Sequence, residues 1–301
     1  VLGGLGEHLA ALLAGRLLYG LGAGGVMSAG ATWLIELSSD VPLGTGARRA
    51  TIALSSGFGS GALVAGVVAQ YAPWPTVLPY ALHVAVLGAM LVLARGAPDT
   101  GGGRPGGRLL RIELPPGMWR RFARAVVPMA PFVFAFPMIV GATLPSLLGG
   151  ALGTAPIAYA GLVNAVTLAA GVLAQPVTRR FEPTTAARLG LGLGVVGIAA
   201  GAWTVHAHAP AMLLAIAIVL GAGYGIAMTA GLSAAQRLAR PDARGGITGL
   251  YYVLTYVGFA VPYLLALIFR VAAPAAALAV TAAITLGVAV TLPRRLLTSI
   301  E

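Results

Sequence analysis

Residues 9–35 have the sequence LAALLAGRLLYGLGAGGVMSAGATWLI and carry a single charged side chain, that of Arg16. A transmembrane helix needs about 20 mostly apolar residues, so this stretch is long enough to cross a bilayer. The same character recurs in residues 50–71, 75–95, 125–149, 155–177, 186–206, 209–236, 246–269 and 273–292. The sequence therefore predicts an all-α membrane protein with about nine transmembrane helices.

The composition supports a membrane protein and excludes several other classes. The chain is 58% hydrophobic and only 9% charged, which does not fit the surface of a water-soluble globule. Its net charge of +11 lies mainly in short loops beside apolar stretches, which indicates membrane orientation and not nucleic-acid binding. The chain has no cysteine, and His206 and His208 do not share a helix face. We expect no metal and no cofactor.

The arginines fix the expected orientation. All 19 basic residues are arginines, and all but Arg16 and Arg270 fall in alternate gaps between the apolar stretches or follow the last one. Cytoplasmic loops of membrane proteins are enriched in arginine and lysine. The pattern predicts a cytoplasmic C-terminus and a first apolar stretch that starts outside.

An internal repeat relates the first and seventh apolar stretches. Leu21-Gly-Ala-Gly24 recurs as Leu220-Gly-Ala-Gly223, each time before an arginine-containing loop and another apolar stretch. A parallel repeat is typical of transporters with two six-helix halves. The chain has either nine helices in all or, as the repeat favours, helices four to twelve with three more upstream. The expected division is a partial N-terminal half (1–95), a cytoplasmic linker (96–124) and a C-terminal six-helix half (125–301).

Two features within this division have alternative interpretations. Residues 118–124 form either a short basic helix on the membrane surface, with Trp119 and Phe122 inward, or a solvated part of the linker. A buried arginine costs about 2.5–3.5 kcal/mol at mid-helix, so Arg16 either serves a wet cavity or extends outward to the interface. Glycine clusters in the first, second and sixth stretches predict close helix packing.

Three motifs carry a family resemblance. Arg16 with Gly20, Gly22 and Gly24 resembles the fourth-helix signature of the major facilitator superfamily. The segment from Gly171 through Gln175 to Arg179 and Arg180 is similar to that superfamily's cytoplasmic loop signature, with Gln175 where the family usually has aspartate. Gly57, Gly61 and Gly66 resemble the fifth-helix signature of its drug/proton antiporter branch, from which Ala62 and Ala65 depart.

The resemblance implies a helical bundle of the major facilitator type, of the twelve-helix variety, whose first three helices would precede this chain. It also implies that helices four, five, seven, eight, ten and eleven line a central cavity. The polar residues on these helices are the candidates for substrate contact, although hydrogen bonding between helices is the alternative role for each. They are Arg16, Tyr19, Ser28, Asn164, Tyr224, Tyr252 and Tyr256.

The expected function is secondary active transport by alternating access, and the antiporter resemblance implies proton-coupled efflux of a small amphiphilic molecule. Uptake of a sugar or organic acid is the alternative, but Asn164 is the one interior amide suited to a sugar. A membrane enzyme would need clustered Asp, His or Cys, which the sequence lacks, so we expect no enzyme. A non-transporting fragment remains a further alternative. The expected partners are the lipid bilayer of the cell membrane, a substrate and protons, with no nucleic acid and a monomeric state.

Overall fold

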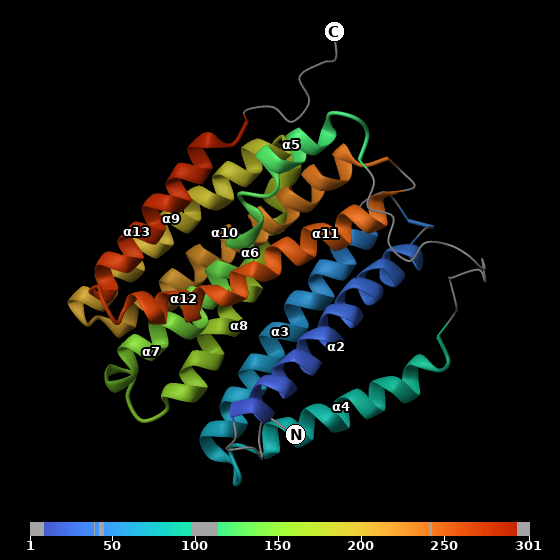
Figure 1. Cartoon of the computed structure of the whole chain (residues 1–301). Coiled ribbons are helices and arrows are strands. Elements are labelled where there is room, and N and C mark those ends of the chain that lie inside the picture. Colours follow the sequence, from blue (N-terminus) through green and yellow to red (C-terminus); the bar gives the residue numbers. More distant parts are fainter. Residues whose placement is uncertain (1–8, 39, 42–44, 98–113, 241–242, 294–301) are drawn as a thin grey trace.

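The computed structural model describes residues 9–38, 40–41, 45–97, 114–240 and 243–293 (Figure 1). These residues form helices and turns, and no strand occurs among them. The helical segments are α2 (Leu9–Glu36), α3 (Thr45–Tyr71), α4 (Leu78–Ala94), α5 (Met118–Ala125), α6 (Ala130–Met138), η1 (Ile139–Thr143), α7 (Leu144–Leu148), η2 (Gly149–Ala151), α8 (Pro156–Ala174), η3 (Gln175–Arg180), α9 (Pro183–Ala207), η4 (Pro210–Met212), α10 (Leu213–Leu238), α11 (Arg244–Tyr256), η6 (Val257–Ala260), α12 (Val261–Ile268) and α13 (Pro274–Thr291).

Membrane-spanning character is confirmed along most of the chain. Seven helical spans in the described residues are long and apolar enough to cross a bilayer. They are Ile52–Tyr71, Met118–Ala151, Pro156–Arg180, Pro183–Ala207, Pro210–Leu238, Gly246–Ile268 and Pro274–Thr291. The apolar helix α4 has 17 residues, and the first predicted stretch forms the 28-residue helix α2. The protein is therefore an all-α integral membrane protein.

Prolines interrupt two of the spans. Pro137 lies inside α6 just before η1, a five-residue π-helical turn, and Pro145 lies in the first turn of α7. Pro262 lies in the first turn of α12, after the 3-10 segment η6. Because proline has no backbone N–H and its ring clashes with the preceding turn, each of these sites breaks the regular α-helical ladder. The α-helical pattern changes to π or 3-10 next to Pro137 and Pro262.

Glycines bring α8, α9 and α10 into close contact. A Cβ atom built on Gly190 would lie 2.9 Å from the Gly223 carbonyl oxygen, and one built on Gly225 would lie 1.9 Å from that of Gly171. Such distances leave no room for any side chain, so the helix backbones touch directly. The core formed around these contacts contains the largest group of fully buried side chains.

The first three helices pack differently. In Figure 1, α3 lies along α8, α2 lies on α3, and α4 lies at the edge of the bundle. Gly66 and Gly161 face each other where α3 meets α8, with a Cβ on Gly161 only 2.7 Å from the Ala62 carbonyl oxygen. No residue of α4 is buried within the described structure. Helix α3 is therefore the main contact between the segments before and after the linker.

The expectation of helix packing at the glycine clusters is confirmed for the sixth stretch and for one glycine of the second. In the sixth stretch, Cβ atoms on Gly190, Gly194 and Gly197 would meet neighbouring helices. In the second stretch, Gly66 packs, but Gly57 and Gly61 face open space in the described part of the chain. For the first stretch the expectation stays a prediction, because among the described residues nothing lies within 4 Å of a Cβ on the glycines. These are Gly20, Gly22, Gly24 and Gly25.

The end of the predicted linker is helical. Helix α5 begins at Met118, so the following span starts earlier than the predicted residue 125. Phe122 is buried in the core, as expected for the inward face of a short helix, whereas Trp119 is 46% exposed and packs edge-on against the Phe122 ring. Residues 118–124 are therefore helical, with Phe122 and not Trp119 inward, and their position on the membrane surface stays a prediction. The glycine- and proline-rich residues 98–107 lie outside the described part.

Candidate substrate cavity

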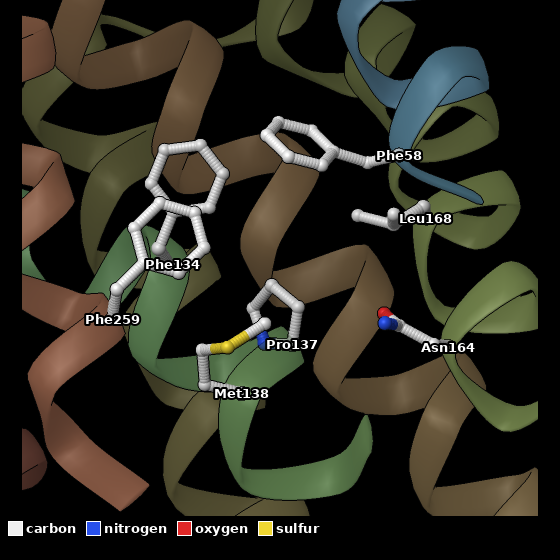
Figure 2. Close-up of a pocket in the computed structure, with 7 residues that line it drawn as sticks. All are labelled: Phe58, Phe134, Pro137, Met138, Asn164, Leu168 and Phe259. Carbon is white, nitrogen blue, oxygen red and sulfur yellow. The ribbon is translucent and has the colours of Figure 1, made fainter. Parts of the chain in front are cut away.

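A small cavity lies between α3, α6, α8 and η6 (Figure 2). Its volume is about 30 Å³, which is enough for one or two water molecules. Its walls are apolar apart from one amide. They are formed by Phe58, Phe134, Pro137, Met138, Asn164, Leu168 and Phe259. The cavity thus lies where α3, which precedes the linker, contacts helices that follow the linker.

Phe134 is the centre of a cluster of aromatic rings at this cavity. Its ring stacks on Phe259 with a centroid distance of 4.6 Å, and Phe58 meets it edge-on at 6.1 Å. The rings of Tyr224 and Tyr256 lie 5.9 Å and 5.7 Å from it. Aromatic pairs at such distances attract each other beyond the burial of their area. The cluster therefore links four helical segments through one side chain.

A close backbone approach creates the stacked pair. A Cβ atom on Gly258 would lie 2.3 Å from the Pro131 carbonyl oxygen and 2.5 Å from the Ala135 nitrogen. Only a residue without a side chain allows η6 to lie this close to α6. The next residue, Phe259, is thereby placed over Phe134.

Asn164 supplies the polar group of the cavity. Figure 2 shows its amide pointing from α8 toward Pro137. Its Oδ1 atom is buried and has no hydrogen-bond partner within the described residues. Gly141, in the π-helical turn η1, leaves room for it, because a Cβ there would lie 3.0 Å from Asn164 Cγ. An unpaired buried amide costs about 1–3 kcal/mol, so this site favours a ligand or water that bonds to it.

Tyr224 connects the cluster to α3. The side chain is fully buried, and its hydroxyl lies 3.1 Å from Ser55 Oγ, which is also buried. Gly171 on α8 makes room for the ring, because a Cβ there would lie only 2.5 Å from Tyr224 Cδ1. The glycine of the loop signature thus positions a tyrosine of α10.

The predicted cavity residues fall into three groups. Tyr224, Tyr252 and Tyr256 belong to the ring cluster, with Tyr252 and Tyr256 6.4 Å apart, and Asn164 lines the cavity. Tyr19 is 58% exposed, and its ring lies 6.1 Å from His83 on α4, away from the cluster. The side chains of Arg16 and Ser28 lie outside the described part of the structure.

The residues of the loop signature differ in burial. Gln175 is buried, and its Nε2 has no hydrogen-bond partner among the described residues. Arg179 and Arg180 are exposed at the end of η3. Nearby, Arg237 and Glu182 form an exposed ion pair of 3.2 Å, which contributes little to stability.

Sequence reasoning identified one of the seven residues that line the cavity, Asn164. Phe134 was not among the candidates, and neither were Phe58 and Phe259. The available signal was weak: Phe58 directly follows Gly57, and Phe259 directly follows Gly258. An aromatic residue beside a glycine on a predicted cavity-lining helix is the pattern that could have identified them.

The sequence pattern of the Major Facilitator Superfamily matches residues 1–263. The chain belongs to the major facilitator superfamily. This confirms the resemblance at the level of the superfamily and makes the protein a membrane transporter, a class that performs no enzymatic reaction. No curated protein matches the chain.

Proposed function

We propose that this major facilitator protein exports a small amphiphilic molecule by alternating access, driven by proton entry. The observation that carries the proposal is the ring-lined cavity between α3 and the helices after the linker. A site between two moving units is the position that alternating access requires. Arg16, Tyr19, Ser28, Tyr252 and Tyr256 remain proposed contacts of the wider pathway.

The lining of the cavity indicates the kind of substrate. Three phenylalanines and a methionine offer apolar and polarizable surface, and Asn164 offers one hydrogen-bonding group. No charged side chain is among the lining residues. We infer a substrate with an aromatic ring, a small number of polar atoms and no localised charge. A sugar would need several amides and hydroxyls, so sugar uptake has less support.

The size of the cavity indicates movement. Sites for drug-sized ligands occupy about 300–1,000 Å³, far more than the volume found here. The helices must separate before such a substrate binds. The breaks at Pro137, Pro145 and Pro262 are positions at which these helices can bend.

The remaining assignments are proposed on sequence grounds. The antiporter branch is supported by Gly57, Gly61 and Gly66. The repeat supports a division into helices four to six (1–95), a linker (96–124) and helices seven to twelve (125–301). The alternating arginines support a cytoplasmic C-terminus in the cell membrane. The signature glycines Gly20, Gly22 and Gly24, with Gly171, Gln175, Arg179 and Arg180, would act in gating. We propose a monomer.

Transport in proteoliposomes tests the function. The full-length protein would be reconstituted with a fluorescent aromatic amphiphile and an imposed pH gradient. We expect gradient-dependent movement that falls at least tenfold in Asn164→Leu and Phe134→Ala. The matched control is Val196→Ala, on the exposed face of α9, which should transport normally. Equal transport by the two cavity variants and the control would contradict the proposed site, and sugar uptake without amphiphile movement would favour the alternative substrate.

A further inference from the structure

Helix α3 bonds through side chains to the helices after the linker at two levels, at Ser55 near its middle and at Gln70 near its C-terminal end. Ser55 bonds to Tyr224 on α10, and Gln70 bonds to the start of α8. These two residues are separated by about 22 Å along the helix axis. Phe58, which lines the cavity, lies between them. Along α3, the two polar contacts therefore lie on opposite sides of Phe58.

The contact of Gln70 completes the start of α8. Ala155, which precedes the helix, has no side chain able to cap it, and Pro156 has no N–H group. The first free donor is the N–H of Ile157, which donates to Gln70 Oε1 at 3.1 Å. Gln70 Nε2 also donates to the Thr154 carbonyl oxygen at 3.4 Å. A helix cap that most proteins supply locally is here supplied by a different helix.

The contact of Ser55 is buried. Ser55 and Tyr224 are both almost fully inaccessible to solvent, and their hydroxyls bond to each other. Separation of these residues would break a buried hydrogen bond, which is costly unless water or another polar group replaces it. The bond therefore opposes opening toward the N-terminal end of α3, which contains Arg49 and is the proposed cytoplasmic end.

We propose that Gln70 and the Ser55–Tyr224 pair are two gate latches, one on the outer side and one on the cytoplasmic side. Each latch holds its own side closed and breaks only when that side opens. Both are formed in this structure, and the cavity beside them is small. The inference rests on the proposed alternating access, and it assigns the opposing gates to named residues.

Distances between paired spin labels test the latches. These 301 residues contain no cysteine, so each cysteine introduced among them is a new labelling site; any cysteine elsewhere in the full-length protein is first replaced by serine. An outer pair at Tyr71→Cys and Met212→Cys and an inner pair at Ala53→Cys and Leu173→Cys use exposed positions at the two ends. Measurements on the full-length protein in nanodiscs without substrate keep this test separate from transport, so failure of the latches and failure of the proposed function give different results.

The expected result is opposite for the two latches. Gln70→Met keeps the size of the side chain but removes both bonds, and it should raise the outward-open fraction about fivefold, since a lost cap costs about 1 kcal/mol. The inner pair should not lengthen. Gln70→Glu keeps an acceptor for Ile157 and should remain close to wild type. Ser55→Ala should lengthen the inner pair, and adding Tyr224→Phe should have no further effect.

Ser60→Ala is the matched control on α3. Its hydroxyl bonds to the Ser56 carbonyl oxygen of its own helix, so neither distance should change. The proposal is overturned if Gln70→Met gives the same outer distances as Ser60→Ala. It is equally overturned if Gln70→Met lengthens both pairs, because the bond would then hold the fold and not one gate.

Discussion

The two copies of the repeated tetrapeptide have different surroundings. In α10, a Cβ atom on Gly221 would lie 2.1 Å from the Thr167 carbonyl oxygen, and one on Gly223 would lie 2.8 Å from that of Gly190. In α2, the corresponding Gly22 and Gly24 meet nothing within 4 Å among the described residues. Among the described residues, the same four residues thus pack tightly in the second copy and not in the first. A glycine pattern shows where helices can approach, and the partner helix decides whether they do.

The largest expected effect comes from filling the packed copy. Gly221→Ala would force α8 and α10 apart at a backbone oxygen, as would Gly225→Ala at the Gly171 carbonyl. Overpacking of this kind costs about 1–3 kcal/mol, and rigid backbone atoms place it at the upper end. Thermal unfolding in detergent, followed by tryptophan fluorescence, should show a clearly lower Tm or loss of the folded protein.

The matched substitutions in the other copy provide the control. Gly22→Ala and Gly24→Ala should leave the Tm unchanged or raise it slightly, because alanine favours a helix over glycine by about 0.5–1 kcal/mol. Equal losses in both copies would show that α2 is packed as tightly as α10, and the contrast between the copies would be wrong.

The next effect concerns a glycine that packs on a side chain. Gly171→Ala would place a methyl group against the Tyr224 ring, which must then move away from Ser55. We expect a loss of about 1–2 kcal/mol, smaller than at Gly221 because a ring yields more readily than backbone. Combining Gly171→Ala with Ser55→Ala should add little, since the first change already breaks the bond. Full additivity in the unfolding free energies would contradict this coupling.

A polar contact between α9 and α13 should have an effect on stability comparable to or smaller than that of Gly171→Ala. Arg188 on α9 donates to the carbonyl oxygens of Val290 and Leu292 at the end of α13. A positive charge there satisfies free carbonyls and complements the helix dipole. Arg188→Met should cost about 1–2 kcal/mol of unfolding free energy. Arg180→Met, at an exposed arginine, should change it by less than about 0.5 kcal/mol, and a reversed order would contradict this role.

The smallest effect is expected at Tyr19, a largely exposed residue on α2. Tyr19→Phe removes a hydroxyl from a largely exposed side chain and keeps the ring near His83. Stability should change by less than about 0.5 kcal/mol in the same unfolding assay. A loss near 2 kcal/mol in the free energy of unfolding would mean that the Tyr19 hydroxyl forms a hydrogen bond beyond the contacts described above.

The sequence predicts the helices well and the cavity only in part. Hydrophobic stretches, arginine gaps and prolines are local signals, and they locate the spans and the breaks near Pro137 and Pro262. The cavity depends on which faces meet across helices far apart in the chain. Phe259 belongs to it through the approach of Gly258 to α6, and Phe58 through the packing of α3 on α8; the glycine before each phenylalanine is a weak local sign. Asn164 could be found because an amide in an apolar helix is itself unusual.

Access to Asn164 from both sides of the membrane tests the central claim most directly. In the cysteine-free chain, Asn164→Cys would be treated with a membrane-impermeant maleimide applied outside or inside proteoliposomes. Alternating access predicts labelling from each side in turn, with no labelling of Val196→Cys on the exposed face of α9. Reactivity from one side only, or from neither, would contradict the placement of the substrate site between α3 and α8.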